Sequence, residues 1–488
     1  LPNPWESGPP PRAVGKRLTA KDIDLSEPIA IIGLGGIFPG AADVPTIWEN
    51  ILAKKDSITE VPADRCDWRL YYDPDPAAPD KTYSKIGGFV PPFPFDASAL
   101  GISAPAAEQM DDVHKMALVA AKAALQDSGY DRKPFDRART AVVLGNSHGG
   151  LKDEVIVLRV FVPFFERLLS DSPTFAGLPE HSRRAILSEF RAGARAGLPP
   201  ITADSLPGSI SSLIAGRVAN VLDFNGVTFT VDAACASALA ALDCAVKGLR
   251  LQEYDMVLSG GVDRSMSPRT YTKFCKLGAL SPDGSRPFDS AANGLVRGEG
   301  GGIYVLKRLR TALKDGDRIY ALIRAVGSSS DGRHRSVVAP HSRGQRLAIP
   351  RAFAQLDYGP GEVGLLEAHG TATVIGDFVE MKVLAEIFGP HAARPSIGLG
   401  SVNSHIGHLK SAAGAAGLMK AVLALHHKTL PPTINVRTPN LNVDWKDSPF
   451  FLVAEPGEWT GSGKARRAHV SAFAFGGVNY HVALEEAP

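Results

Sequence analysis

The sequence predicts a large, layered α/β protein, and three observations carry this prediction. The chain has 488 residues, too many for one ordinary core and suited to two packed domains or one large duplicated domain. Hydrophobic residues make up 44% and charged residues 21%, a composition that favours a globular protein over a disordered or membrane-embedded one. Short β-rich runs also alternate with alanine-rich helical stretches along most of the chain, which is typical of layered α/β structure.

The first half of the chain opens its ordered part with Pro28–Gly36. This apolar, β-branched run ends in glycines and predicts a buried strand followed by a turn. We expect four further strands, at Arg139–Ser147, Gly226–Ala234, Tyr254–Asp263 and Gly301–Leu309. Alanine-rich stretches predict helices over Val113–Gly129 and Ser237–Gln252.

The second half repeats this rhythm, although no residue-level repeat is detectable. We expect strands or strand ends in segments 318–330, 363–373, 396–404 and 469–486, and helices around 344–356 and 414–427. Two similar α/β halves follow from this pattern, and we place them at residues 27–290 and 291–488.

Two segments depart from the alternation of strands and helices. Residues 1–26 hold four prolines in the first ten positions and have no hydrophobic period, which predicts an extended linker. Residues 151–205 are charged and helix-prone. We interpret them as an insertion near an entrance or an interface between copies of the chain.

Charge and cysteine content exclude several classes of partner. Lys and Arg total 53 against 51 Asp and Glu, which gives no reason to expect nucleic acid or an anionic membrane as a partner. No apolar run approaches the roughly 20 residues of a membrane helix, and the start of the chain does not read as a signal peptide. The four cysteines show no CxxC spacing, which argues against structural zinc and disulfides. We expect a cytoplasmic protein.

Cys235 is the first candidate for chemistry. It lies between the strand TFTVDAA and a helix beginning at SALAAL, where the positive end of the helix dipole favours a thiolate of low pKa. Its small neighbours leave room for a substrate. The local sequence leaves open that Cys235 is a small buried hydrophobic residue, and for Cys244, inside the apolar helix, that is the preferred interpretation.

Two histidines follow strands in the second half. His369 ends an apolar strand and precedes Gly370, Thr371 and Thr373, a small polar turn suited to a hydroxylated or amide-bearing ligand. His408 follows a strand and a glycine and leads into a helix of small residues. Either histidine alone is more often structural. Together with a cysteine they suggest a nucleophile with two hydrogen-bond donors or bases.

Four segments resemble the signature segments of β-ketoacyl synthases of the thiolase superfamily, in the family's order and spacing. These are VDAACASALAAL, EAHGTAT, NSHIGHLKSAAG and FAFGGVNYHVALEEAP. The resemblance extends over roughly residues 28–488. Three features resemble the ketosynthase domains of polyunsaturated fatty acid synthases and related iterative polyketide synthases. They are VDAACASALAAL, DGDRIYALIRAVGSSSDG and the Lys410 of GHLKSAAG.

The resemblance implies a thiolase-like five-layer α/β/α/β/α sandwich built from two similar halves. Cys235 would accept an acyl chain, and a malonyl-type extender would then lose carbon dioxide and attack that chain. His369 and His408 would donate hydrogen bonds to the extender's thioester carbonyl, and the backbone N–H groups of Cys235 and Phe475 would form the oxyanion hole.

The resemblance also implies ligands and partners. Thr371 and Thr373 match positions that bind the phosphopantetheine arm, and Phe475 matches a gate beside the nucleophile. The expected partners are acyl carrier protein, neighbouring synthase domains and a second copy of the chain in a homodimer. No cofactor is expected in this domain, since its substrates arrive on the phosphopantetheine of the carrier.

The sequence departs from the family pattern at several positions. Asn403 stands where most relatives have a lysine, so the cation at that position is missing or is supplied otherwise, and decarboxylation is the step this affects. Ala372, Ala474 and Val478 carry extra carbon where relatives have glycine, glycine and threonine, which predicts a reshaped pocket or a stiffer gate. His405 stands where relatives often have asparagine.

Other interpretations remain open. His405 and His408 are spaced three apart, but no carboxylate or third histidine is close in sequence, so we predict no metal. Asn403 favours an acyltransferase that passes the chain on without elongation. A carrier-binding scaffold or chain-length partner without activity is the third alternative.

Overall fold

The computed structural model describes residues 23–333, 336–392, 395–460 and 463–488. The expected linker falls almost entirely outside the described residues. Eleven strands form a hydrogen-bonded series in the order β12-β10-β9-β14-β15-β8-β1-β7-β6-β4-β5. Their bounds, in that order, are Phe450–Leu452, Ile397–Gly400, Leu365–Glu367, Arg467–Ala474, Val478–Glu486, Ala321–Ser330, Ile29–Ile37, Gly300–Arg308, Met256–Asp263, Thr140–Gly145 and Thr228–Val231.

Two halves with the same strand order make up this series. The first half contributes β1, β4, β5, β6 and β7, which lie in the sheet as β5-β4-β6-β7-β1. The second half contributes β8, β9, β10, β14 and β15, which lie as β10-β9-β14-β15-β8. In both halves the order is third, second, fourth, fifth and first strand along the chain. In each half the first two pairs of strands are parallel and the last two are antiparallel. The sequence prediction of two similar α/β halves is therefore confirmed.

The boundary between the halves differs from the expected one. Strand β7 pairs with β1 and β6 and so belongs to the first half, while β8 opens the second. The division falls between Arg308 and Ala321 instead of at residue 290, because β7 completes the first sheet before the chain crosses over.

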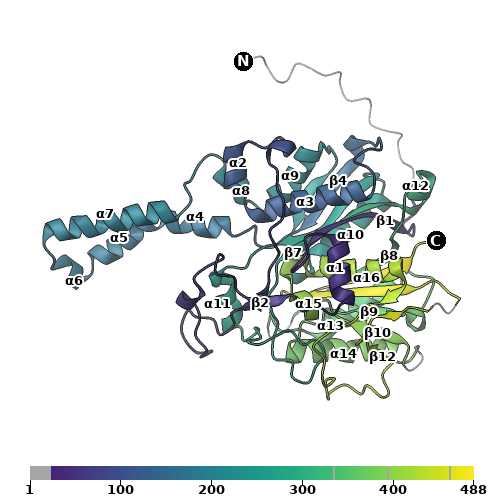
Figure 1. The fold of residues 1–488 in the computed structure, drawn as a ribbon. Coiled ribbons are helices and arrows are strands. Elements are labelled where there is room, and N and C mark those ends of the chain that lie inside the picture. Colours follow the sequence, from purple (N-terminus) through teal and green to yellow (C-terminus); the bar gives the residue numbers. More distant parts are fainter. Residues whose placement is uncertain (1–22, 334–335, 393–394, 461–462) are drawn as a thin grey trace, which may run out of the picture.

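Helices form three layers around the two halves of the sheet (Figure 1). Helices α3 and α9 cover the outer face of the first half, α13 and α14 cover the outer face of the second, and α10 and α16 pack together between them. The bounds of these six helices are Asp112–Asp127, Ser212–Leu222, Ser342–Phe353, Val374–Phe388, Ser237–Arg250 and Ala413–His427. This is the five-layer α/β/α/β/α arrangement that the resemblance implies.

The two central helices, α10 and α16, are rich in small residues and are largely buried. Every residue of α16 from Ala413 to Leu425 is buried, and its many alanines and glycines let it pack closely between the two sheets. The predicted helices at 113–129, 237–252, 344–356 and 414–427 are confirmed as α3, α10, α13 and α16.

The segment 151–205 is helical, as expected, and projects from the body as an arm (Figure 1). Its helices are α4, Lys152–Val160; α5, Val162–Ser170; α6, Pro173–Ala176; and α7, Glu180–Gly197. The remaining helices are α1, Val44–Leu52; α2, Ala104–Gln109; α8, Ser205–Ser209; α11, Pro268–Lys276; α12, Leu309–Lys314; and α15, Asn403–Ile406.

Short elements complete the fold. Two small antiparallel pairs join β2, Ile58–Glu60, to β3, Ile86–Gly88, and β11, Thr429–Leu430, to β13, Gly457–Glu458. The 3-10 turns are Trp68–Leu70, Ser98–Leu100, Arg137–Arg139, Ala234–Ala236, Pro360–Glu362 and Lys410–Ala412. Across the described ranges, no helix has both the length and the apolar character needed to cross a membrane.

Candidate active site

Cys235 lies in a tight turn, η5 (Ala234–Ala236), between strand β5 and helix α10. Ala234 has a φ of 48°, a left-handed conformation that is costly for a residue with a Cβ atom. The turn is held by Ser237, whose hydroxyl donates to the Ala234 carbonyl at 2.7 Å and accepts from the Ala233 N–H at 2.9 Å. The strand-to-helix junction predicted for Cys235 is confirmed.

The protonation state of Cys235 differs from the expected one. The residue is 9% exposed, and burial, with the nearby charge of Asp263 as the second cause, raises the pKa of the thiol to about 12. The prediction of a low pKa from the helix dipole was wrong, because desolvation of an anion outweighs the favourable helix terminus. At neutral pH Cys235 is a thiol, and its proton must leave during acylation.

His369 lies in the turn after β9, and two polar side chains hold this turn from opposite sides. Glu380, on α14, accepts hydrogen bonds from the N–H groups of His369 and Gly370 at 2.8 and 2.9 Å. The Asn403 amide donates to the carbonyls of the same two residues at 2.8 and 3.2 Å. The peptide groups around His369 are therefore fixed by side-chain hydrogen bonds.

His408 follows α15 and is fixed through its backbone. Gly407 has a φ of 72°, a conformation open to glycine, and the His408 N–H donates to the Val296 carbonyl at 2.7 Å. The imidazoles of His369 and His408 are 5.1 Å apart between ring centroids and nearly perpendicular. Burial lowers the pKa of His369 to about 4 and lowers that of His408 well below its ordinary value. Both imidazoles are neutral at pH 7.

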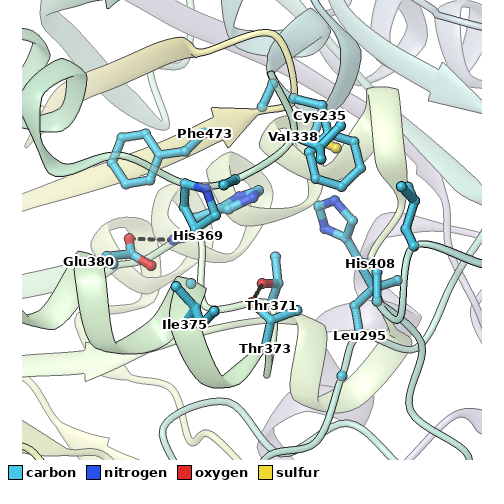
Figure 2. Close-up of a pocket in the computed structure, with 18 of the residues that line it drawn as sticks. Cys235, Leu295, Val338, His369, Thr371, Thr373, Ile375, Glu380, His408 and Phe473 are labelled. Carbon is cyan, nitrogen blue, oxygen red and sulfur yellow. Dashed lines mark hydrogen bonds between the residues drawn. The ribbon is translucent and has the colours of Figure 1, made fainter. Parts of the chain in front are cut away.

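These residues meet at one cavity of about 300 Å³. In Figure 2 the two imidazoles face the space beside Cys235, and Thr371 and Thr373 border the same space. The cavity is lined by the ten residues labelled in Figure 2 and by further residues that include Phe475. The structure thus brings together the side chains that the sequence singled out from both halves of the chain.

Phe475 lies in the loop between β14 and β15 and packs toward Phe274 of α11, with ring centroids 6.1 Å apart. Among the three positions with extra carbon, Ala474 lines the cavity, whereas Ala372 and Val478 are not among its lining residues. Ala372 is fully buried with a φ of 63°, so it strains the turn rather than filling the pocket.

His405 is a structural residue. Its Nδ1 and Nε2 atoms each lie 3.1 Å from a backbone carbonyl oxygen, those of Lys55 and Pro432. In the described part of the chain, no group of three or more histidine, cysteine or acidic side chains could hold a metal ion.

Sequence reasoning missed the carboxylates that support the site. Asp377 and Glu380 are buried on α14, and burial raises their pKa values to about 7 and about 8. Asp377 accepts from the Ala372 N–H at 3.1 Å, so both carboxylates hold the turn of His369. The available signal was a pair of acidic residues three apart on one face of a mostly apolar helix.

The strand order defines a thiolase-like α/β fold, and the chain belongs to the β-ketoacyl synthase family. Residues 26–312 match the model "Beta-ketoacyl synthase, N-terminal domain", and residues 320–437 match "Beta-ketoacyl synthase, C-terminal domain".

Similar proteins are components of large synthases. The chain is 36% identical over 467 residues to one of the phenolphthiocerol/phthiocerol polyketide synthase proteins of Mycobacterium tuberculosis, covering 95% of this chain and 28% of that protein. It is 36% identical over 472 residues to a component of the polyunsaturated fatty acid synthase of Thraustochytrium sp., covering 95% of this chain and 16% of that protein. The chain thus spans less than a third of either relative.

Solved ketosynthase domains share the fold. The oxazolomycin ketosynthase domain OzmH KS7 of Streptomyces albus superposes with a TM-score of 0.80 at 33% identity, covering 95% of this chain and 74% of that one. The ketosynthase from module 6 of the bacillaene synthase of Bacillus subtilis gives a TM-score of 0.79 at 31% identity, covering 95% and 72%.

Proposed function

We propose that this chain catalyses decarboxylative Claisen condensation as a ketosynthase domain in polyketide or polyunsaturated fatty acid biosynthesis. The observation that carries the proposal is the convergence of Cys235, His369 and His408 on one cavity. A nucleophile beside two neutral imidazoles suits a reaction that forms first a thioester and then an enolate.

The first half-reaction loads Cys235. The sulfur attacks the thioester carbonyl of an acyl group carried on the phosphopantetheine of acyl carrier protein, the carbon–sulfur bond to the carrier breaks, and the carrier thiol leaves. Because the pKa of Cys235 is raised to about 12, its proton must pass to a base. His408 is neutral and lines the same cavity as Cys235, so it is suited to accept that proton and to return it to the departing carrier sulfur.

The second half-reaction extends the chain. His369 and His408 donate hydrogen bonds to the thioester carbonyl of a malonyl-type extender, the bond to its carboxylate breaks, and carbon dioxide leaves. The resulting enolate attacks the acyl carbonyl on Cys235, whose oxyanion accepts from the backbone N–H groups of Cys235 and Phe475. Expulsion of the Cys235 thiolate releases a β-ketoacyl thioester on the carrier. Thr371 and Thr373 bind the phosphopantetheine arm.

Asn403 supports a second candidate function. Its amide holds the His369 turn by hydrogen bonds but supplies no positive charge for decarboxylation. A ketosynthase that loads Cys235 and passes the chain on without elongation is consistent with this substitution. A scaffold or chain-length partner without activity is the third candidate, and the intact set of Cys235, His369 and His408 argues against it.

The proposed partners are acyl carrier protein, neighbouring synthase domains and a second copy of the chain. Strand β5 lies at the edge of the sheet and pairs with β4 alone among the described strands, and Val227 and Phe229 are exposed there. An uncovered edge strand with apolar side chains supports symmetric dimerisation. We propose that the domain is cytoplasmic, binds no cofactor of its own and needs neither nucleic acid nor a membrane.

Incubation with acyl and malonyl carrier proteins tests the proposal. We expect acylation of Cys235, release of carbon dioxide and a β-ketoacyl product on the carrier. Intact-mass measurement detects the acylation, and Cys235→Ala is the control. Loading and transfer without carbon dioxide release identify the non-elongating acyltransferase. An unloaded Cys235 across a panel of acyl thioesters identifies the scaffold.

A further inference from the structure

A buried ion pair lies next to the turn that carries Cys235. The Lys410 ammonium is 3.0 Å from the Asp263 carboxylate, and the two side chains are 4% and 0% exposed. Asp263 ends strand β6 and accepts further hydrogen bonds from the Ser265 N–H and hydroxyl and from the Ser411 hydroxyl, at 2.9, 2.7 and 2.7 Å. Lys410 also donates to the Gly298 carbonyl. Burying two charges costs several kcal/mol each, so the pair calls for a reason beyond stability.

The pair is held close to Cys235 by packing of the two 3-10 turns. Turn η7, Lys410–Ala412, contacts both η5 and strand β6. Gly261 of β6 permits this approach, since a Cβ atom there would lie 2.7 Å from the Cβ of Ala238 and 2.9 Å from the Ser411 carbonyl oxygen. Lys410 itself adopts a φ of 52°, so the backbone bears strain at the residue that carries the ammonium.

The two charges act on the sulfur in opposite directions. Beyond burial, the charge of Asp263 raises the pKa of Cys235 and that of Lys410 lowers it, with Arg297 as a weaker second cation. His148 and His408 also face this cluster, and burial lowers the pKa values of both, which favours their neutral forms. The fixed charges near the nucleophile are therefore those of Asp263, Lys410 and Arg297.

We propose that Lys410 and Asp263 are positioning residues for the nucleophile, the ammonium favouring the anionic sulfur of Cys235 and the carboxylate opposing it. This inference rests on the proposed role of Cys235. In the chemistry proposed above, the sulfur must be anionic both when it attacks and when it leaves, and Lys410 is the cation placed to support it. Lys410 thus supplies a positive charge close to His408 in a site where Asn403 supplies none.

The test is the rate at which iodoacetamide alkylates Cys235 at pH 8.5, followed by peptide mass spectrometry on the whole chain. Asp263 keeps its three other hydrogen bonds in Lys410→Met and stays ionised at this pH, so its charge acts unopposed and alkylation slows. In Asp263→Asn alkylation accelerates. Because a thiolate becomes more nucleophilic as its pKa rises, we expect a change of roughly threefold for each pKa unit in either direction.

Matched variants separate charge from structure. Lys410→Arg keeps the charge and is expected to alkylate faster than Lys410→Met. Lys420 forms an equally buried ion pair, 2.9 Å from Glu367, and its charge acts on His405. Lys420→Met should leave the rate at Cys235 within about twofold. Cys275, 3% exposed, reports unfolding in each variant, since its alkylation must stay slow for a native chain.

Rates that change in the same direction in Lys410→Met and Asp263→Asn, or that change in neither, overturn the proposal. If Lys410→Met exposes Cys275, that variant is set aside, and the alkylation rates of Cys235 in Asp263→Asn and Lys410→Arg are compared with the rate in the unaltered chain. A rate that does not increase in Asp263→Asn then overturns the proposal. Acyl loading is measured separately. If the alkylation rate of Cys235 responds to the two substitutions but no acyl carrier protein loads it, the proposed function is contradicted and the charge effect stands. If Cys235 is loaded but its alkylation rate does not respond, only this inference is contradicted.

Discussion

The two halves of the molecule place the same turn–helix unit at corresponding positions and use it differently. In the first half, η5 carries Cys235 two residues before α10; in the second, η7 carries Ser411 two residues before α16. Each turn opens with a left-handed residue, Ala234 at 48° and Lys410 at 52°. The residue before each helix also agrees, with φ of −96° at Ala236 and −95° at Ala412.

The difference lies in what the side chains face. Cys235 lines the cavity, whereas Ser411 is fully buried and donates to Asp263. A duplicated fold thus supplies two strained turns in contact. One presents the proposed nucleophile, and the other carries Lys410 and Ser411, which bind the Asp263 carboxylate.

Removing the sulfur has the largest expected effect. Cys235→Ala should abolish acyl loading and condensation completely, because no other group at the cavity can form the thioester. Intact-mass measurement after incubation with acyl carrier protein checks the loading. Cys244→Ala, in helix α10 and outside the cavity, is the control, and loss of loading there would remove the distinction drawn between the two cysteines.

The contribution of the second half to the chemistry is tested by His369→Ala. Its imidazole is proposed to hydrogen-bond the extender's carbonyl, so carbon dioxide release should fall by about 10²- to 10³-fold. Loading of Cys235 should persist, because that step does not use His369. Carbon dioxide release and acyl mass measured on the same sample separate the two steps. Equal loss of both would show that His369 serves the first half-reaction as well.

The rate at which Cys235 is alkylated should rise about a hundredfold over two pH units. With its pKa raised to about 12, the thiol is protonated below that pH, and the thiolate fraction increases tenfold for each unit of pH between 7 and 9. Alkylation of Cys235 by iodoacetamide should rise in the same proportion without a plateau. A plateau near pH 7 would instead match the low pKa that the helix dipole predicted.

The positions of Cys235 and His369 in the fold were predictable from sequence because each follows a recognisable strand. Cys235 and His369 both stand where an apolar run meets glycine or alanine, and a chain that turns there places its next side chain at a sheet edge. His408 instead follows helix α15, where the sequence predicted a strand end at 396–404. The supporting groups were not predictable in this way. Asp263 lies 147 residues before Lys410, and Glu380 reaches backbone groups rather than side chains, so no local pattern connects them to the site.

The pKa of Cys235 was mispredicted for a related reason. A helix terminus is visible in the sequence, but the depth of burial depends on residues from both halves that close over the sulfur. Desolvation is a property of the packed site. The predicted boundary at residue 290 differs from the observed one for a similar reason. Strand β7 pairs with β1, at the start of the first half, and this long-range pairing is not visible in the local sequence.

The smallest expected effect belongs to the second turn. Ser411→Ala removes a buried hydroxyl that donates to Asp263 at 2.7 Å, and losing one hydrogen bond to a buried charge costs about 1.5 to 3 kcal/mol. Chemical denaturation should therefore show a lower free energy of unfolding, while acyl loading of Cys235 continues, because Lys410 still pairs with the carboxylate. Ser237→Ala is the matched control in the first turn, where the lost hydroxyl holds the Ala234 backbone and loading should decline. If Ser411→Ala impaired loading as strongly as Ser237→Ala, the two turns would share the work of shaping the nucleophile instead of dividing it.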